Sequence, residues 1–140
     1  MTTRTGIERG TEVDVAVEND VVTARQAGRE LARGLGFGAA DQTRLATAIS
    51  EVARNALKYA GKGVCRIYDT SDAGAIGVEV VVEDSGPGIP DVIRAMADGY
   101  TTGGSLGYGL PAAKRLVSDF QVESEPGHTQ VTMRMRRPRL

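Results

Sequence analysis

The chain shows two hydrophobic periods, which predict short strands and longer helices. Residues 11–17 alternate between apolar and polar positions, as a half-buried strand does. A helical period follows as far as Gly36, which we expect to end the helix in the left-handed conformation. Asn19 or Asp20 is the expected cap at its start. The apolar face of this first helix is predicted to consist of Ala24, Ala27, Leu31 and Leu35.

A second helix of about twenty residues is predicted, with Asp41 as its cap and the glycines at positions 61 and 63 as its stop. The residues expected on its buried face are Leu45, Ile49, Val52, Ala56 and Ala60. The opposite face carries a polar stripe that consists of Arg44, Thr47, Glu51, Asn55 and Lys58.

The second half of the chain is dominated by apolar runs typical of strands. Residues 64–68 and 77–83 are predicted to pair, and residues 84–90 are predicted to form a turn. Residues 121–125 and 129–135 are predicted to form a last pair around Gly127.

Two helices are predicted between these strand pairs. Residues 105–119 contain a helix whose inner face holds Leu110, Ala113, Leu116 and Val117, and Pro111 is compatible with it only in the first turn. A short helix is possible at residues 91–97, within a Gly-rich stretch that we expect to be mobile.

The resulting order, β-α-α-β-β-α-β-β, predicts an α+β two-layer sandwich with a mixed, largely antiparallel sheet and helices on one face. The length of 140 residues suits one domain over residues 1–140, in which residues 1–10 are expected to be weakly held.

Composition excludes several functions. A net charge of −1, from 17 basic and 18 acidic residues, provides no electrostatic footprint for nucleic acid. The arginines near the C-terminus are expected to be a solvated strand end. We expect no membrane span and no signal peptide, and the single Cys65 indicates a reducing cytoplasm and a core position. One histidine, His128, is too few for the usual zinc sites.

Candidate chemistry begins with Glu51 and Asn55, which are one turn apart on the polar stripe. Beside a nucleotide, a carboxylate can take a proton from an attacking hydroxyl, and an amide oxygen suits Mg²⁺. Lys58, one turn further, could reach a phosphate. Taken alone, the stripe is equally what a solvated helix face looks like.

Two Gly-rich segments accompany this helix. Asp84 ends an apolar strand and precedes Gly86 and Gly88, so its carboxylate could accept a hydrogen bond from an exocyclic amine such as that of adenine. The same residues are also typical of a simple turn. The second segment opens a helix, where free backbone N–H groups favour phosphate, and it contains Gly103, Gly104, Gly107 and Gly109. Neither the P-loop pattern nor a Rossmann unit occurs.

In this order, the three motifs resemble the N, G1 and G2 boxes of the ATPase superfamily shared by gyrase, the ninety-kilodalton heat-shock chaperone, histidine kinases and mismatch-repair ATPases. The resemblance covers residues 45–135. Glu51-x-x-x-Asn55, the short lid and the length resemble the bacterial serine-kinase and anti-sigma-factor branch, especially the switch kinases of the stressosome, a stress-response complex. The fold implied is the Bergerat ATP-binding fold.

The resemblance implies a role for each residue. Glu51 would be the general base, Asn55 would hold Mg²⁺, and Asp84 would bind the adenine amine of ATP. Lys58 matches a basic position of the family, and Thr129 matches a threonine that supports adenine through water. The residues implied to shape the pocket and lid are Gly86, Gly88, Ile89, Gly104, Gly107 and Gly109. One departure is His128, which stands where the family usually has glycine.

Three functions remain open at this point. The first is an ATP- and Mg²⁺-dependent serine/threonine kinase that acts on a small STAS-type scaffold protein in partner switching and also activates a regulatory serine phosphatase. The second is an anti-sigma factor or phosphatase-activating module in which ATP is mainly structural, with Arg25, Arg29 and Arg33 as a binding surface. The third, a detached histidine-kinase domain, is disfavoured because no helical hairpin carries a histidine.

Overall fold

The structure is a computed structural model that describes residues 10–89 and 109–139. The predicted short helix at residues 91–97 and most of the predicted weakly held N-terminal stretch lie outside these residues. The elements, in chain order, are β1 (Gly10–Val15), α1 (Glu18–Leu35), α2 (Ala39–Ala60), β2 (Gly63–Asp69), β3 (Ala75–Asp84), α4 (Gly109–Leu116), β4 (Asp119–Glu125) and β5 (His128–Pro138).

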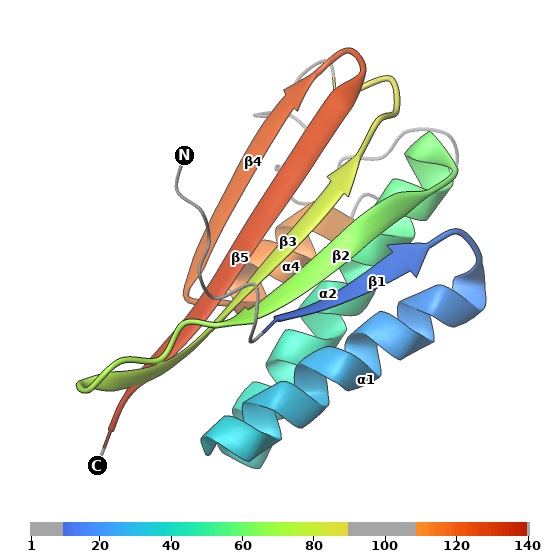
Figure 1. The fold of residues 1–140 in the computed structure, drawn as a ribbon. Helices are drawn as coiled ribbons and strands as arrows, with labels where there is room; N and C mark the ends of the chain where they lie inside the picture. The colour runs from blue at the N-terminus through green and yellow to red at the C-terminus, as the bar shows by residue number, and fades with distance from the viewer. Residues whose placement is uncertain (1–9, 90–108, 140) are drawn as a thin grey trace.

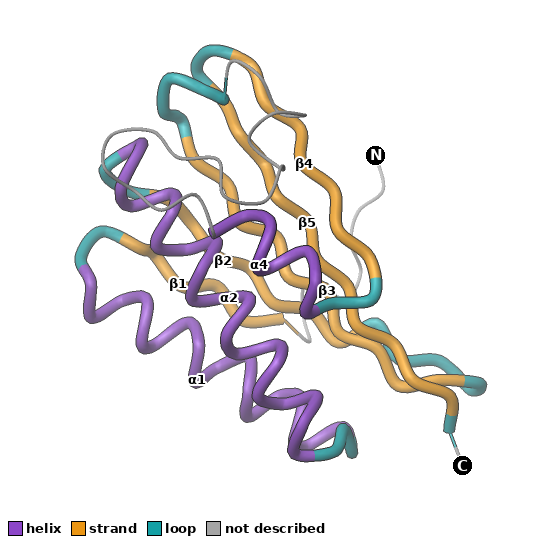
Figure 2. The backbone as a smooth tube through the Cα atoms, turned by 180° about the vertical axis from the view of Figure 1, so that it is seen from behind, coloured by secondary structure: helices purple, strands orange, loops and turns teal. Residues whose placement is uncertain are grey.

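The strands form one sheet, and the helices lie together on one of its faces (Figures 1 and 2). The strand order is β1-β2-β3-β5-β4, and all of these neighbours pair antiparallel. The α+β two-layer sandwich is therefore confirmed. We expected a mixed sheet, but no parallel pair occurs among the described strands. β3 and β4 run in the same direction because each pairs antiparallel with β5, which lies between them.

The core lies between the sheet and the helices. Alternate residues of the central strands, such as Val80 of β3 and Met133 of β5, point toward the helices and are fully buried. Burying a side chain of this size contributes about 1.5–3 kcal/mol. Of the predicted face of α2, Leu45, Ile49, Val52 and Ala56 are buried, whereas Ala60 is only half-buried at the end of the helix.

The helix ends follow the glycine predictions but not the cap predictions. Gly36 and Gly61 end α1 and α2 with φ angles of 103° and 83°, as expected. Asp20 is not the cap of α1: it lies in the first turn, where its carboxylate accepts hydrogen bonds from the backbone N–H groups of Ala16 and Val17, at 2.8 and 3.1 Å.

Asp41 is likewise not the cap of α2, because Gly38 occupies that position. The Asp41 carboxylate instead pairs with Arg44, one turn along the helix, at 2.8 Å, and with Arg137 of β5 at 2.8 and 2.9 Å. Arg137 donates two N–H groups to the Asp41 carboxylate, and this contact replaces a hydrogen bond from the backbone at the start of the helix.

The arginines near the C-terminus are half-exposed, as expected, but they are also paired across elements. Arg134 contacts Glu79 at 2.9 Å and Asp119 at 2.7 Å. Arg136 contacts Asp72 in the β2–β3 loop. These residues therefore fasten the far end of β5. In the part of the chain that the structure describes, no helix is both long and apolar enough to cross a membrane.

Candidate functional site

Two residues of the polar stripe of α2, Glu51 and Asn55, lie beside the start of α4. Glu51 and Asn55 are half-buried, while Lys58 is exposed, with its Nζ 5.4 Å from the ring centre of Tyr59. A Cβ atom built on Gly109, the first residue of α4, would lie 3.9 Å from both Glu51 Oε1 and Asn55 Oδ1. A carboxylate and an amide thus lie beside a helix N-terminus, whose free N–H groups and partial positive charge favour phosphate.

The turn after β3 packs against the last turn of α2. Asp84 is half-buried, and its Oδ1 accepts a hydrogen bond of 2.9 Å from the N–H of Gly86. A Cβ built on Gly86 would lie 2.9 Å from Cα and 2.5 Å from Cβ of Ala60, which leaves no room for a side chain. The approach of this turn to the last turn of α2 therefore requires glycine.

The same turn is also fastened to the β4–β5 hairpin. Gly88 adopts a φ of 85°, and a Cβ there would lie 2.6 Å from the carbonyl oxygen of Glu125. The N–H of Gly127 donates to the carbonyl of Gly86 at 2.9 Å. The N–H of Ile89 donates to Ser124 Oγ at 2.7 Å. The turn is therefore held between α2 and the hairpin rather than projecting freely.

Thr129 lies next to Asp84 across the sheet. The two residues are register partners on β3 and β5, and Thr129 is only 4% exposed. Its Oγ1 lies 2.7 Å from Ser124 Oγ. The sequence analysis missed Ser124, although it is a polar residue in the series Phe120, Val122, Ser124 that continues the inner face of β4.

His128, where the sequence departs from the family, points to the opposite face of the sheet. Its Nε2 lies 2.7 Å from Glu83 Oε2, while Arg66 holds the other oxygen of Glu83 at 2.6 Å. The hydrogen bond to Glu83 raises the pKa of His128, and the hydrogen bonds from His128 and Arg66 lower the pKa of Glu83. The His128 side chain therefore lies on the other face of the sheet from the Asp84–Thr129 pair.

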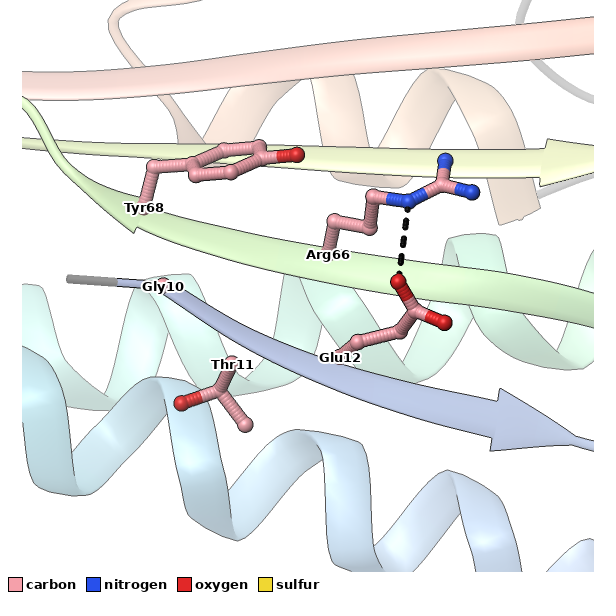
Figure 3. A pocket seen from close by; sticks show the side chains of 5 residues that line it. All are labelled: Gly10, Thr11, Glu12, Arg66 and Tyr68. Carbon is pink, nitrogen blue, oxygen red and sulfur yellow. Dashed lines mark hydrogen bonds and ion pairs between the residues drawn. The ribbon is translucent and has the colours of Figure 1, made fainter. Parts of the chain in front are cut away.

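A pocket at the β1–β2 edge contains none of the predicted site residues. It is lined by Gly10, Thr11, Glu12, Arg66 and Tyr68 (Figure 3). The charge of Arg66 is already balanced there by Glu12, at 3.3 Å, and by Glu83. We assign no chemistry to this pocket.

The metal-ligating and thiol side chains limit the chemistry of the described residues. Within residues 10–89 and 109–139, no group of three or more His, Cys, Asp or Glu side chains could hold a metal ion. The amide of Asn55, which lies next to the N-terminus of α4, does suit Mg²⁺, because this ion takes few protein ligands and keeps several waters. Burial raises the pKa of the Cys65 thiol to about 12, which agrees with the predicted core role.

Three predicted glycines, Gly103, Gly104 and Gly107, lie outside the described residues, as does the predicted lid. The remaining predicted residues fall at one end of the sandwich. Glu51, Asn55 and Lys58 come from α2 and Gly109 from α4, Asp84 ends β3, Gly86 to Ile89 follow it, and Thr129 lies near the start of β5.

Comparisons with known proteins place this arrangement in context. Residues 15–135 match the family described as histidine kinase-like ATPase domain. The chain is 50% identical over 115 residues to "Serine/threonine-protein kinase RsbT" of Bacillus subtilis (strain 168), which covers 82% of this chain and 86% of that protein.

Solved structures agree in fold. The RsbU and RsbW domains of Rv1364c from Mycobacterium tuberculosis match with a TM-score of 0.66 and 23% identity over 94% of this chain, which spans 33% of that longer chain. The mycobacterial sensor histidine kinase MprB matches with a TM-score of 0.58 and 23% identity, over 92% of this chain and 99% of that one.

Proposed function

Because this chain belongs to the histidine kinase-like ATPase family, we propose that it is a serine/threonine-protein kinase that transfers the γ-phosphate of ATP to a small STAS-type scaffold protein. The pathway would be a bacterial stress response based on partner switching. The 50% identity to the kinase RsbT over most of both chains supports the enzyme class. We expect the protein to act in the cytoplasm, where its ATP is available.

The observation that carries the proposal is the position of Gly109 beside Glu51 and Asn55. Phosphoryl transfer requires mainly that the attacking hydroxyl be held in line with the phosphorus and the leaving oxygen, and that the charge on the phosphates be neutralised. Glu51 would take the proton from the attacking hydroxyl of the partner. The N-terminus of α4 would bind phosphate oxygens, together with Gly104 and Gly107, and Lys58 would add a positive charge.

The residues at the end of the sheet would hold the base of the nucleotide. Asp84 would accept the hydrogen bond of the adenine amine, and Thr129 would support the base from the neighbouring strand. Gly86, Gly88 and Ile89 would form the wall beside it. The Asn55 side-chain oxygen would bind Mg²⁺, which would neutralise charge on the phosphates.

The partners follow from the same proposal. RsbT is named as a serine/threonine kinase, and a STAS-type scaffold is the substrate class that we propose for this chain. We also propose a regulatory serine phosphatase as a second partner, which the kinase would activate after leaving the scaffold.

The test is transfer of label from γ-labelled ATP, with Mg²⁺, to a panel of small STAS proteins, followed by mapping of the modified residue. We expect label on a serine or threonine of at least one partner. Asp84→Asn should abolish phosphate transfer because the adenine of ATP is no longer held. Asp14 is an exposed aspartate on β1, and Asp14→Asn should leave transfer unchanged. ATP binding without transfer to any partner would overturn the kinase and favour a nucleotide-dependent binding module.

A further inference from the structure

Three polar side chains form a row across the inner face of the sheet at its site end. Asp84 of β3 is the register partner of Thr129 of β5, and Thr129 is the register partner of Ser124 of β4. Directly opposed residues of antiparallel strands have their Cβ atoms about 4.5–5.5 Å apart, so the three side chains are neighbours. Further along the same face, the side chains are apolar: Val82, Val131 and Val122 form the next row.

Ser124 connects the middle of this row to the turn after β3. Its Oγ lies 2.7 Å from the backbone nitrogen of Ile89 and 2.7 Å from Thr129 Oγ1. The N–H of Ile89 can only donate, so Ser124 Oγ is an acceptor in that bond. A hydroxyl that accepts one hydrogen bond becomes a better donor in the next. Of the two directions open to the Ser124–Thr129 bond, this cooperativity favours the one in which Ser124 donates its proton to Thr129.

This direction determines what Thr129 can do. When Thr129 Oγ1 accepts from Ser124, the threonine proton is left available as a donor toward the side occupied by Asp84. The row then presents a carboxylate acceptor beside a hydroxyl donor. The edge of adenine is complementary, because it offers an amine donor next to a ring-nitrogen acceptor.

We propose that Ser124 is a positioning residue for the purine base: it orients the hydroxyl of Thr129 and ties it to Ile89, so that the Asp84–Thr129 pair selects adenine. This inference rests on the proposed function, which places the nucleotide base at this end of the sheet. Hypoxanthine, in which a carbonyl and a ring N–H replace the amine and the ring acceptor, presents the reverse pattern to the row.

The test measures base selectivity, defined as the Kd for inosine diphosphate divided by the Kd for ADP. Ser124→Ala should weaken ADP binding by roughly 3- to 10-fold, the value of a typical hydrogen bond, and lower the selectivity. Ser124→Thr keeps a hydroxyl and should restore both. Ser118→Ala, which removes a hydroxyl bonded to the backbone N–H of Arg136 at the other end of the hairpin, should change neither.

A double-mutant cycle separates positioning from general stability. If Ser124 acts through Thr129, Ser124→Ala should have no further effect on selectivity in a Thr129→Val background. Additive losses, or an unchanged selectivity in Ser124→Ala, would overturn the inference. A wild-type protein that binds neither nucleotide would instead overturn the proposed function, and the role of Ser124 with it.

Discussion

At the scale of single residues, close backbone contact rather than side-chain chemistry explains Gly86. The turn that follows Asp84 touches Ala60 of α2 so closely that a Cβ atom on Gly86 would lie 2.9 Å from the Cα of Ala60. A backbone atom cannot rotate away as the end of a flexible side chain can. The glycine therefore sets the separation between the end of β3 and the helix that carries Glu51 and Asn55.

Gly86→Ala should consequently lower both the stability of the protein and its affinity for ADP. We expect a loss of about 1–3 kcal/mol in the free energy of unfolding, as for other overpacked positions. Gly34→Ala is the matched control, because a Cβ on Gly34 of α1 meets nothing within 4 Å. That variant should gain about 0.4–1 kcal/mol. Equal effects of the two substitutions in chemical denaturation would refute the packing argument.

His128 provides a residue-scale prediction on pH. Its pKa is raised above the ordinary value of 6.5 by the hydrogen bond to Glu83. A raised folded-state pKa means that the pair stabilises the protein below about pH 6.5 and that this contribution is lost as the pH rises through the folded value. The difference in Tm between the wild type and His128→Gln should thus be larger at acidic than at alkaline pH. A difference that is constant across this range would contradict the pair.

The sequence points to Asp84 through its Gly-rich motif and to Thr129 through the family resemblance, whereas no motif includes Ser124. Its importance depends on strand register, which makes it the neighbour of Thr129. The alternation of Phe120, Val122 and Ser124 along β4 signals the inner face of the sheet, but it does not identify Thr129 as the neighbour of Ser124. The bond from Ile89 was not accessible, because it joins residues 35 positions apart.

At the scale of elements, the helices were predicted by their apolar faces and misjudged at their starts. The period of α2 correctly placed Leu45, Ile49 and Val52 in the core. The sequence favours Asp41 as the cap because aspartate near a helix start usually caps the helix. Its actual partner, Arg137, is 96 positions away, and no local pattern could have revealed it. The Asp41–Arg137 contact ties the start of α2 to the last strand.

Asp41→Asn should therefore lower the free energy of unfolding by about 1 kcal/mol, since it weakens a two-bond arginine contact. The hydrogen bond from Arg137 lowers the pKa of Asp41 below its ordinary value of 3.8. A lowered pKa means that the contribution is present above pH 3.8 and is lost as the pH falls through the folded value. Asp14→Asn on β1 should have no such effect. Equal unfolding curves for the two variants at neutral pH would argue against the contact.

At the scale of the whole molecule, the topology explains why distant motifs meet. Because β5 lies between β3 and β4, the end of β3 and the start of β5 become neighbours, and Asp84 meets Thr129. The packing of α4 on α2 brings Gly109 to Glu51 (Figure 2). The order of elements predicted the layers correctly. It did not predict the strand order, because adjacency in the sheet depends on long-range pairing that hydrophobic periods do not encode.

The central claim is that the carboxylate of Glu51 acts as the base in phosphoryl transfer at the α2–α4 contact. The most direct measurement compares single-turnover transfer by the wild type and by Glu51→Gln at equal nucleotide occupancy, with Glu30→Gln, an exposed glutamate on α1, as the control. We predict that Glu51→Gln keeps the wild-type affinity for ADP and loses roughly 10²- to 10⁴-fold in transfer rate, while the control changes neither. A Glu51→Gln protein that transfers phosphate at the wild-type rate would contradict the account.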